Sequence, residues 1–150
     1  MNPRTIDTGT IERDVLVDCV RTALSEEPLW AEGSFGTTLA FVYRGDRHPT
    51  FDPSIVVADV PLGGPDLSTH ATSVELARST SADGSPRRLT FLESSRTGSM
   101  TTEVIVADHA DSLVQITACA AEGDVGLIAG ACERIVAELA DATARDSASR

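Results

Sequence analysis

The fold of this chain is decided by the stretch Val125-Gly-Leu-Ile-Ala-Gly-Ala-Cys-Glu-Arg-Ile-Val-Ala-Glu-Leu139. Its apolar residues fall in one stripe at helical spacing: Val125, Ile128, Cys132, Ile135, Val136 and Leu139. The charged residues fall on the other side: Glu133, Arg134, Glu138 and Asp141. This pattern predicts an amphipathic helix laid on a sheet, with Asp124 as its N-cap and with fraying beyond about Ala142.

The segments upstream of this helix supply the strands of the sheet. Residues 102–107 and 113–120 are two predicted strands, and the short polar connection 108–111 favours antiparallel pairing. Residues 39–43, 55–60 and 88–93 are further strands, with a polar hairpin loop over 94–99. The nearly continuous apolar run 55–60 indicates an interior strand covered on both faces, and 29–35 reads as a connection or a short edge strand.

Two more helices complete the predicted order of elements. Residues 11–25 show helical spacing after Thr10, and Leu67, Ala71 and Val74 predict a helix over 68–79. The order of helix, two strands, helix, three strands and helix predicts an α+β fold, a mostly antiparallel sheet flanked by helices. We expect a single domain over 1–150 with an ordered core over about 10–142.

The composition excludes several chemistries. The formal net charge is −11, which disfavours binding to nucleic acid and to anionic membranes, although acidic surfaces also simply keep proteins soluble. All 12 basic residues are arginine. Schiff-base and pyridoxal-phosphate chemistry, and a Walker-type phosphate loop, need a lysine and are therefore excluded.

The cysteines and the first residues favour a cytoplasmic protein. Cys19, Cys119 and Cys132 are odd in number and far apart, and no C-x-x-C pair is present. Cys19 and Cys132 fall on apolar helix faces, whereas Cys119 lies among the less apolar residues of its strand, so its burial is less certain. Free thiols suit a reducing compartment, and residues 1–10 show no signal peptide.

No catalytic or metal-binding set stands out. The chain has no G-x-S-x-G elbow, and Gly33-Ser-Phe-Gly36 reads as a glycine-rich entry to a strand rather than as a nucleophile loop. If their loops converge, a divalent ion could be bound by Asp46, His48, Asp52, Asp108, His109 and Asp111. Aspartate and histidine are also ordinary residues of tight turns. We expect no catalytic residue, no cofactor and no metal.

Two groups of residues are candidates for a partner surface, one apolar and one basic. They are Leu29, Trp30 and Phe35, and Arg87, Arg88 and Arg96. Trp30 is also a candidate core anchor at the edge of the sheet, and the arginines are also candidates for solubilising edge residues.

Three segments carry a resemblance to a known family: Phe51-Asp-Pro-Ser-Ile-Val-Val57, Leu113-Val-Gln-Ile-Thr-Ala118 and the closing amphipathic helix. With these, residues 39–139 resemble PsbP-like domains, nearest the actinobacterial LpqN-type lipoprotein group. The resemblance implies an α/β/α sandwich around an antiparallel sheet, and accessory, partner-binding proteins rather than enzymes. The chain departs from the lipoproteins in having no lipidation cysteine near its start and Ser54 where an asparagine is typical. No functional residue is carried over.

The hypothesis that follows is a non-catalytic accessory module that binds a protein partner, with a homodimer as one form of this binding. The alternative is a small-ligand carrier or an enzyme with a pocket between sheet and helix, where Arg87, His109 or Asp111 would converge. A third reading, a partner for a basic protein, rests on the charge alone.

Overall fold

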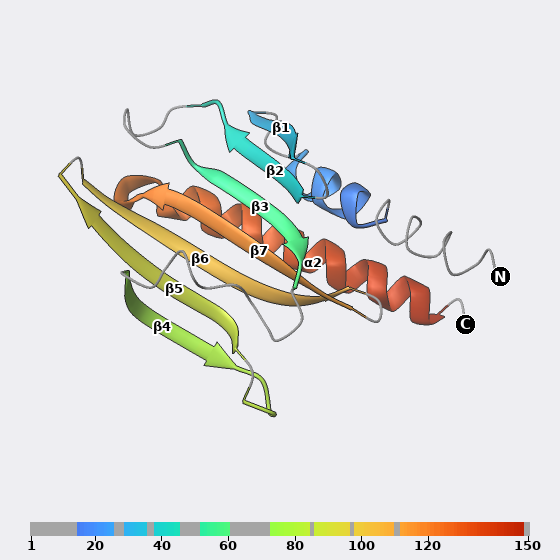
Figure 1. Cartoon of the computed structure of the whole chain (residues 1–150). Helices are drawn as coiled ribbons and strands as arrows, with labels where there is room; N and C mark the ends of the chain where they lie inside the picture. The colour runs from blue at the N-terminus through green and yellow to red at the C-terminus, as the bar shows by residue number, and fades with distance from the viewer. Residues whose placement is uncertain are drawn as a thin grey trace.

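The chain folds into one antiparallel sheet with two helices on one of its faces (Figure 1). The structure is a computed structural model that describes residues 15–25, 29–35, 38–45, 52–60, 73–84, 86–96, 98–109 and 112–148. The strands are β1 (Trp30–Phe35), β2 (Thr38–Tyr43), β3 (Ser54–Asp59), β4 (Val74–Thr80), β5 (Pro86–Ser95), β6 (Gly98–His109) and β7 (Ser112–Ala121). The helices are an N-terminal helix over 15–24 and α2 (Val125–Ala148), which follows the 3-10 turn η2 (Glu122–Asp124).

The order of the seven strands across the sheet is β1-β2-β3-β7-β6-β5-β4. Strands β5, β6 and β7 form a meander, and the short connections between them impose the antiparallel pairing. Strand β3 joins this meander to the β1–β2 hairpin by pairing with β7, where Ile55 stands opposite Ala118. Strands β1 and β4 are therefore the two edges of the sheet.

The larger buried cluster lies between the sheet and the helices, and a smaller one, Leu89, Phe91 and Val104, lies on the other face of the sheet. The stripe residues Ile128, Cys132 and Ile135 of α2 are 0% exposed. They join one apolar cluster with Ile116, Ala118 and other residues of β2, β3, β6 and β7. Leu16 and Val20 of the N-terminal helix belong to the same cluster, so both helices cover the same face.

The predicted α+β class and the antiparallel sheet are confirmed, and so are all five predicted strands. The segment 29–35 contains an edge strand, β1, and the loop expected over 94–99 is a tight turn between β5 and β6. Both described helices lie on one face, so a second helical layer, as in a sandwich, is not seen in the described residues. Helix α2 continues to Ala148, past residue 142, and fraying of its last turns stays a prediction. The expected N-cap, Asp124, lies in η2.

The helix predicted over 68–79 was wrong in its described part, which is strand β4. From one paired position to the next, β4 moves on by two residues, from Glu75 to Ala77, whereas β5 moves on by one. This bulge adds one residue, so Val74 and Ala77 lie on the same face although they are three residues apart. The bulge thus gives β4 a spacing of apolar residues that resembles that of a helix. Pairing with β5, rather than this spacing, determines that the segment is a strand.

The expectation that 55–60 is covered on both faces was also wrong in part. Ile55 and Val57 of β3 are 0% exposed, whereas the alternate residues Ser54, Val56 and Ala58 are half-buried. β3 is an interior strand because it pairs with β2 on one side and β7 on the other. A strand with two paired neighbours can still have one face open to solvent.

The burial contrast between α2 and β4 predicts a contrast in stability. Replacing Ile135 by alanine removes a fully buried side chain and should lower the free energy of unfolding by about 3 kcal/mol. Val74→Thr keeps a β-branched residue at a position that is 61% exposed and should change it by less than about 0.5 kcal/mol. Urea denaturation of both variants tests this, and equal losses would contradict the assigned core.

Candidate functional site

The apolar candidates Leu29, Trp30 and Phe35 do not form one exposed surface. Trp30 is only 8% exposed, and its ring packs edge-on against Tyr43 with centroids 5.3 Å apart. It is the core anchor at the sheet edge that the sequence offered as the alternative. Leu29 is 47% exposed, and Phe35 ends β1 with a side chain outside the described part of the chain.

The arginine candidates are also separated. Arg88 Nη2 donates to both carboxylate oxygens of Glu103, at 3.1 and 3.2 Å, and Nη1 donates to Glu133 of α2 at 3.1 Å. Arg87 approaches Asp108 of β6 at 3.7 Å, and Arg96 lies exposed at the turn between β5 and β6. Arg88 therefore joins β5, β6 and α2, and the three side chains do not converge on a common ligand position.

The cysteines are unsuited to nucleophilic catalysis. Cys19 and Cys132 are buried and Cys119 is half-buried, as the sequence predicts. Burial raises the pKa of Cys132 to about 12, and burial also raises the pKa of Cys19 and of Cys119. Because the thiolate is the reactive form, all three thiols are poor nucleophiles near neutral pH.

The metal hypothesis gains no support from the described residues. Among them, no group of three or more histidine, cysteine, aspartate or glutamate side chains is placed to hold an ion. Asp46, His48 and Asp111 lie outside the described residues, as does the side chain of His109.

A groove lies between the sheet and the C-terminal half of α2, where the alternative hypothesis expects a pocket. Its volume is about 640 Å³, and it opens to solvent. The described lining residues are Arg87, Ile105, Val106, Ala107, Asp108, Val136, Leu139, Ala140, Thr143 and Ala144. Alanines on both walls leave the space unfilled, and Arg87 and Asp108 are the described charged residues of a mainly apolar lining, so the groove suits a mainly apolar molecule.

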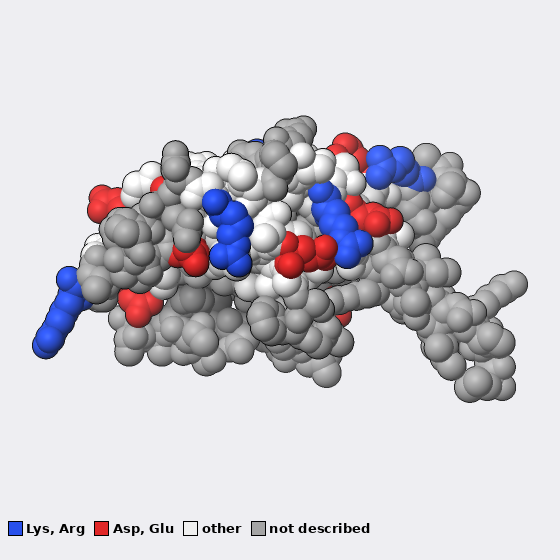
Figure 2. Space-filling model, turned by 90° about the horizontal axis from the view of Figure 1, so that it is seen from above, with Lys and Arg blue, Asp and Glu red and all other residues white. Residues whose placement is uncertain are grey.

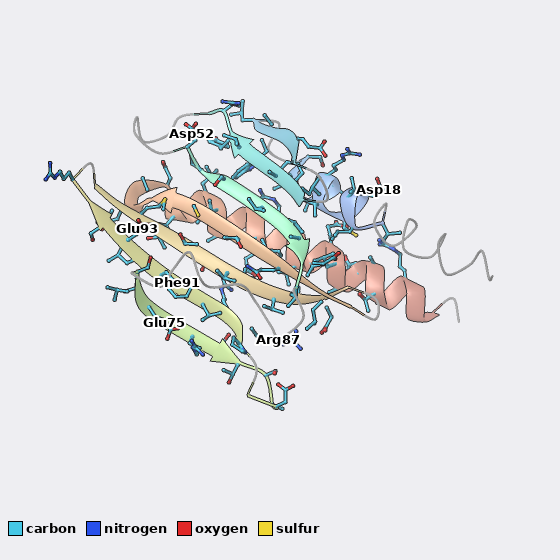
Figure 3. The ribbon with its side chains drawn as sticks, viewed as in Figure 1. Asp18, Asp52, Glu75, Arg87, Phe91 and Glu93 are labelled. Atoms are coloured by element: carbon cyan, nitrogen blue, oxygen red, sulfur yellow. The ribbon has the colours of Figure 1, made fainter. Side chains whose placement is uncertain are left out.

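Strand β4 is a feature that the sequence reasoning missed. All seven of its residues are exposed, including Val74 at 61% and Leu76 at 55%. In the described chain, β4 is hydrogen-bonded to a neighbour on one side only, β5. Glu75 lies across from Phe91 on the sheet face opposite the helices (Figure 3). The turn Asp83-Gly84, with Gly84 at φ +86°, was the available signal that a hairpin strand precedes it.

On the face of the molecule seen from the side of β1, described side chains of both charges occur together (Figure 2). Among the described residues, Arg21 forms an ion pair with Glu32 at 2.9 Å. The described part of the chain contains no helix that is both long and apolar enough to cross a membrane.

The comparisons with known proteins give a distant structural likeness. No protein family model matches the chain, and no curated protein matches it. Among solved structures, it is similar to the crystal structure of LpqN, involved in cell envelope biogenesis of Mycobacterium tuberculosis. The identity is 15% and the TM-score 0.48, over 72% of this chain and 75% of that chain. The resemblance to the LpqN-type group thus stands as a distant likeness of fold, and LpqN's role does not carry over.

The raised pKa of Cys132 predicts a loss of stability at alkaline pH. The folded protein keeps this thiol protonated up to about pH 12, whereas the unfolded chain releases the proton near its ordinary value of 9.0. The stabilising contribution is therefore complete below pH 9 and is lost as the pH rises toward 12. The chain has no lysine and one tyrosine, so few other groups titrate in this window.

Urea denaturation in reducing buffer at several pH values between 8 and about 11 measures this effect. The free energy of unfolding should fall more steeply in the native sequence than in Cys132→Ala, by a total on the order of 2 kcal/mol. Equal slopes in the two proteins would mean that Cys132 is not held in its neutral form by burial.

Proposed function

We propose that this chain is a non-catalytic accessory module that binds another protein chain along the outer edge of β4. The observation that carries the proposal is a seven-residue strand at the edge of the sheet in which every residue is exposed. An edge strand presents unpaired N–H and C=O groups, which another extended segment can satisfy by adding a strand.

The side chains of β4 support this mode of binding. Val74 and Leu76 expose large apolar surfaces that a partner strand or its flanking residues would remove from water. Glu75 and Arg78 add polar contacts beside them. In strand addition the main chain supplies affinity, whereas such side chains supply the choice of partner.

The chemistry of the described residues supports binding rather than catalysis. The thiols have raised pKa values, and Arg88 is engaged by two carboxylates within the fold. The free thiols also support a reducing compartment, such as the cytoplasm, as the place where the module works.

Photo-crosslinking in the source cells tests the proposal. A benzophenone amino acid at Ser79, on β4, should yield a crosslinked protein product, whereas the same group at the exposed Ala137 of α2 should not. Adding Leu76→Lys should remove most of the product, because the charge would have to be buried against the partner strand. No product from Ser79, or equal products from both positions, would refute binding through β4.

A second candidate function, small-ligand carriage, is favoured by the groove between α2 and β6. Its lining is mainly apolar, with Arg87 and Asp108 as its described charged residues. An apolar molecule bearing one anionic group would match this lining, with its charge near the guanidinium of Arg87.

Binding of 1-anilinonaphthalene-8-sulfonate tests the second candidate. Ala140 lines the groove, and Ala140→Trp should fill it and reduce the fluorescence enhancement several-fold. Ala137→Trp places the same ring on α2 at a position outside the groove lining and should leave the enhancement unchanged. An equal response from both variants would show that the dye binds elsewhere.

A further inference from the structure

We infer that the chain that pairs with β4 is a second copy of this chain, in an antiparallel arrangement that sets Glu75 of each copy opposite Arg78 of the other. This inference rests on the proposed function, because it names the partner of the same edge. The resulting dimer would extend the sheet across a two-fold axis that passes through the middle of β4.

The bulge in β4 makes this arrangement geometrically consistent. Residues three apart in a regular strand lie on opposite faces. Here the extra residue, Leu76, brings Glu75 and Arg78 onto one face, across from Phe91 and Leu89 of β5. The ion pair between Arg78 Nη2 and Glu75 Oε1, at 2.7 Å, agrees with this placement.

The order of side chains in β4 is self-complementary under a two-fold axis. When two copies run antiparallel with the bulges facing each other, Glu75 meets Arg78 and Arg78 meets Glu75. In the same register Val74 meets Ser79, and both of these residues lie on the face that carries the helices, across from Leu92 and Arg88. Opposite charges directly across neighbouring strands stabilise their pairing, whereas like charges in these positions oppose it.

Leu76 lies at the centre of this arrangement, close to its own copy across the axis. Its side chain is 55% exposed in the single chain, and pairing would bury it against the Leu76 and Ala77 of the second copy. An isologous contact of this kind uses the same patch twice, so one exposed strand suffices for a closed dimer.

Two features oppose association and set its strength. Each chain carries a net charge of −11, so the copies repel at long range until salt screens them. Charges and bulges on edge strands also commonly serve to prevent pairing. Here the charges have opposite signs and the bulge aligns them, so they block a mismatched partner but match a second copy. We therefore expect a weak dimer that forms with increasing protein concentration.

Sedimentation velocity of the full chain at about 0.15 M ionic strength tests the inference. The mass should rise from 15.8 kDa toward twice that value as the concentration increases. Glu75→Arg and Arg78→Glu each place like charges opposite each other and should sediment as monomers. An equimolar mixture of the two variants should dimerise again, and so should the double variant E75R/R78E.

The matched control exchanges the charges of another exposed ion pair, Arg21 with Glu32, at the β1 edge of the sheet. The double variant R21E/E32R should dimerise like the native sequence. Thermal unfolding of all variants confirms that they are folded. A native chain that stays monomeric throughout, single variants that still dimerise, or a mixture that stays monomeric would each overturn the inference.

The two proposals fail in distinguishable ways. A monomer whose Ser79 position crosslinks to a different protein would overturn the second copy as the partner and leave binding through β4 intact. A dimer that is unaffected by the Glu75 and Arg78 variants, without crosslinks from Ser79, would overturn both.

Discussion

The packing of the α2 stripe on the sheet is the contact on which the rest of the structure depends. Ile128, Cys132 and Ile135 are 0% exposed, and the facing strand β7 presents small residues, Ala118 and Ala120, that are also 0% exposed. Small residues on the sheet let the backbone of the helix approach closely, so the larger side chains of α2 fill the space between them. The N-terminal helix then packs beside α2, where Arg134 Nε donates to the carbonyl oxygen of Ala23 at 3.0 Å.

One polar cluster interrupts this apolar layer. Arg88 bridges Glu103, which is 8% exposed, and Glu133 on the exposed side of α2. A carboxylate that is largely withdrawn from water needs a cation with good hydrogen-bond geometry, and the two bonds from Arg88 Nη2 supply it. Because the same guanidinium reaches α2, the cluster fixes where the helix lies along β5 and β6. This role explains an arginine that the sequence alone placed on a partner surface.

Periodicity predicted the parts of the fold in which local pattern and tertiary structure agree. The stripe of α2 and the alternating residues of β7 have one buried face each, so their spacing reveals their conformation. β4 has no buried face, and its bulge places Val74 and Ala77 at a spacing that resembles a helix. The candidate surface residues are separated for a related reason: composition marks Leu29, Trp30, Arg87 and Arg88 as unusual, but which face each occupies depends on strand pairing. The groove lies between segments that are far apart in sequence. The sequence therefore predicted a pocket between sheet and helix but not most of the residues that line it.

The reach of α2 also explains why the two edges of the sheet differ. The helix packs on β6 and β7, and the apolar layer beneath it ends near β5. The β1 edge is supported by the N-terminal helix, to which it is joined by two hydrogen bonds from Arg21 Nε to Glu32, at 3.0 and 3.1 Å, and by the buried ring of Trp30. β4 lies beyond the core and, within the described residues, is held by its ladder with β5. A strand that contributes no buried side chain to the core can vary for recognition, because among the described strands it pairs with β5 alone and its other edge faces outward.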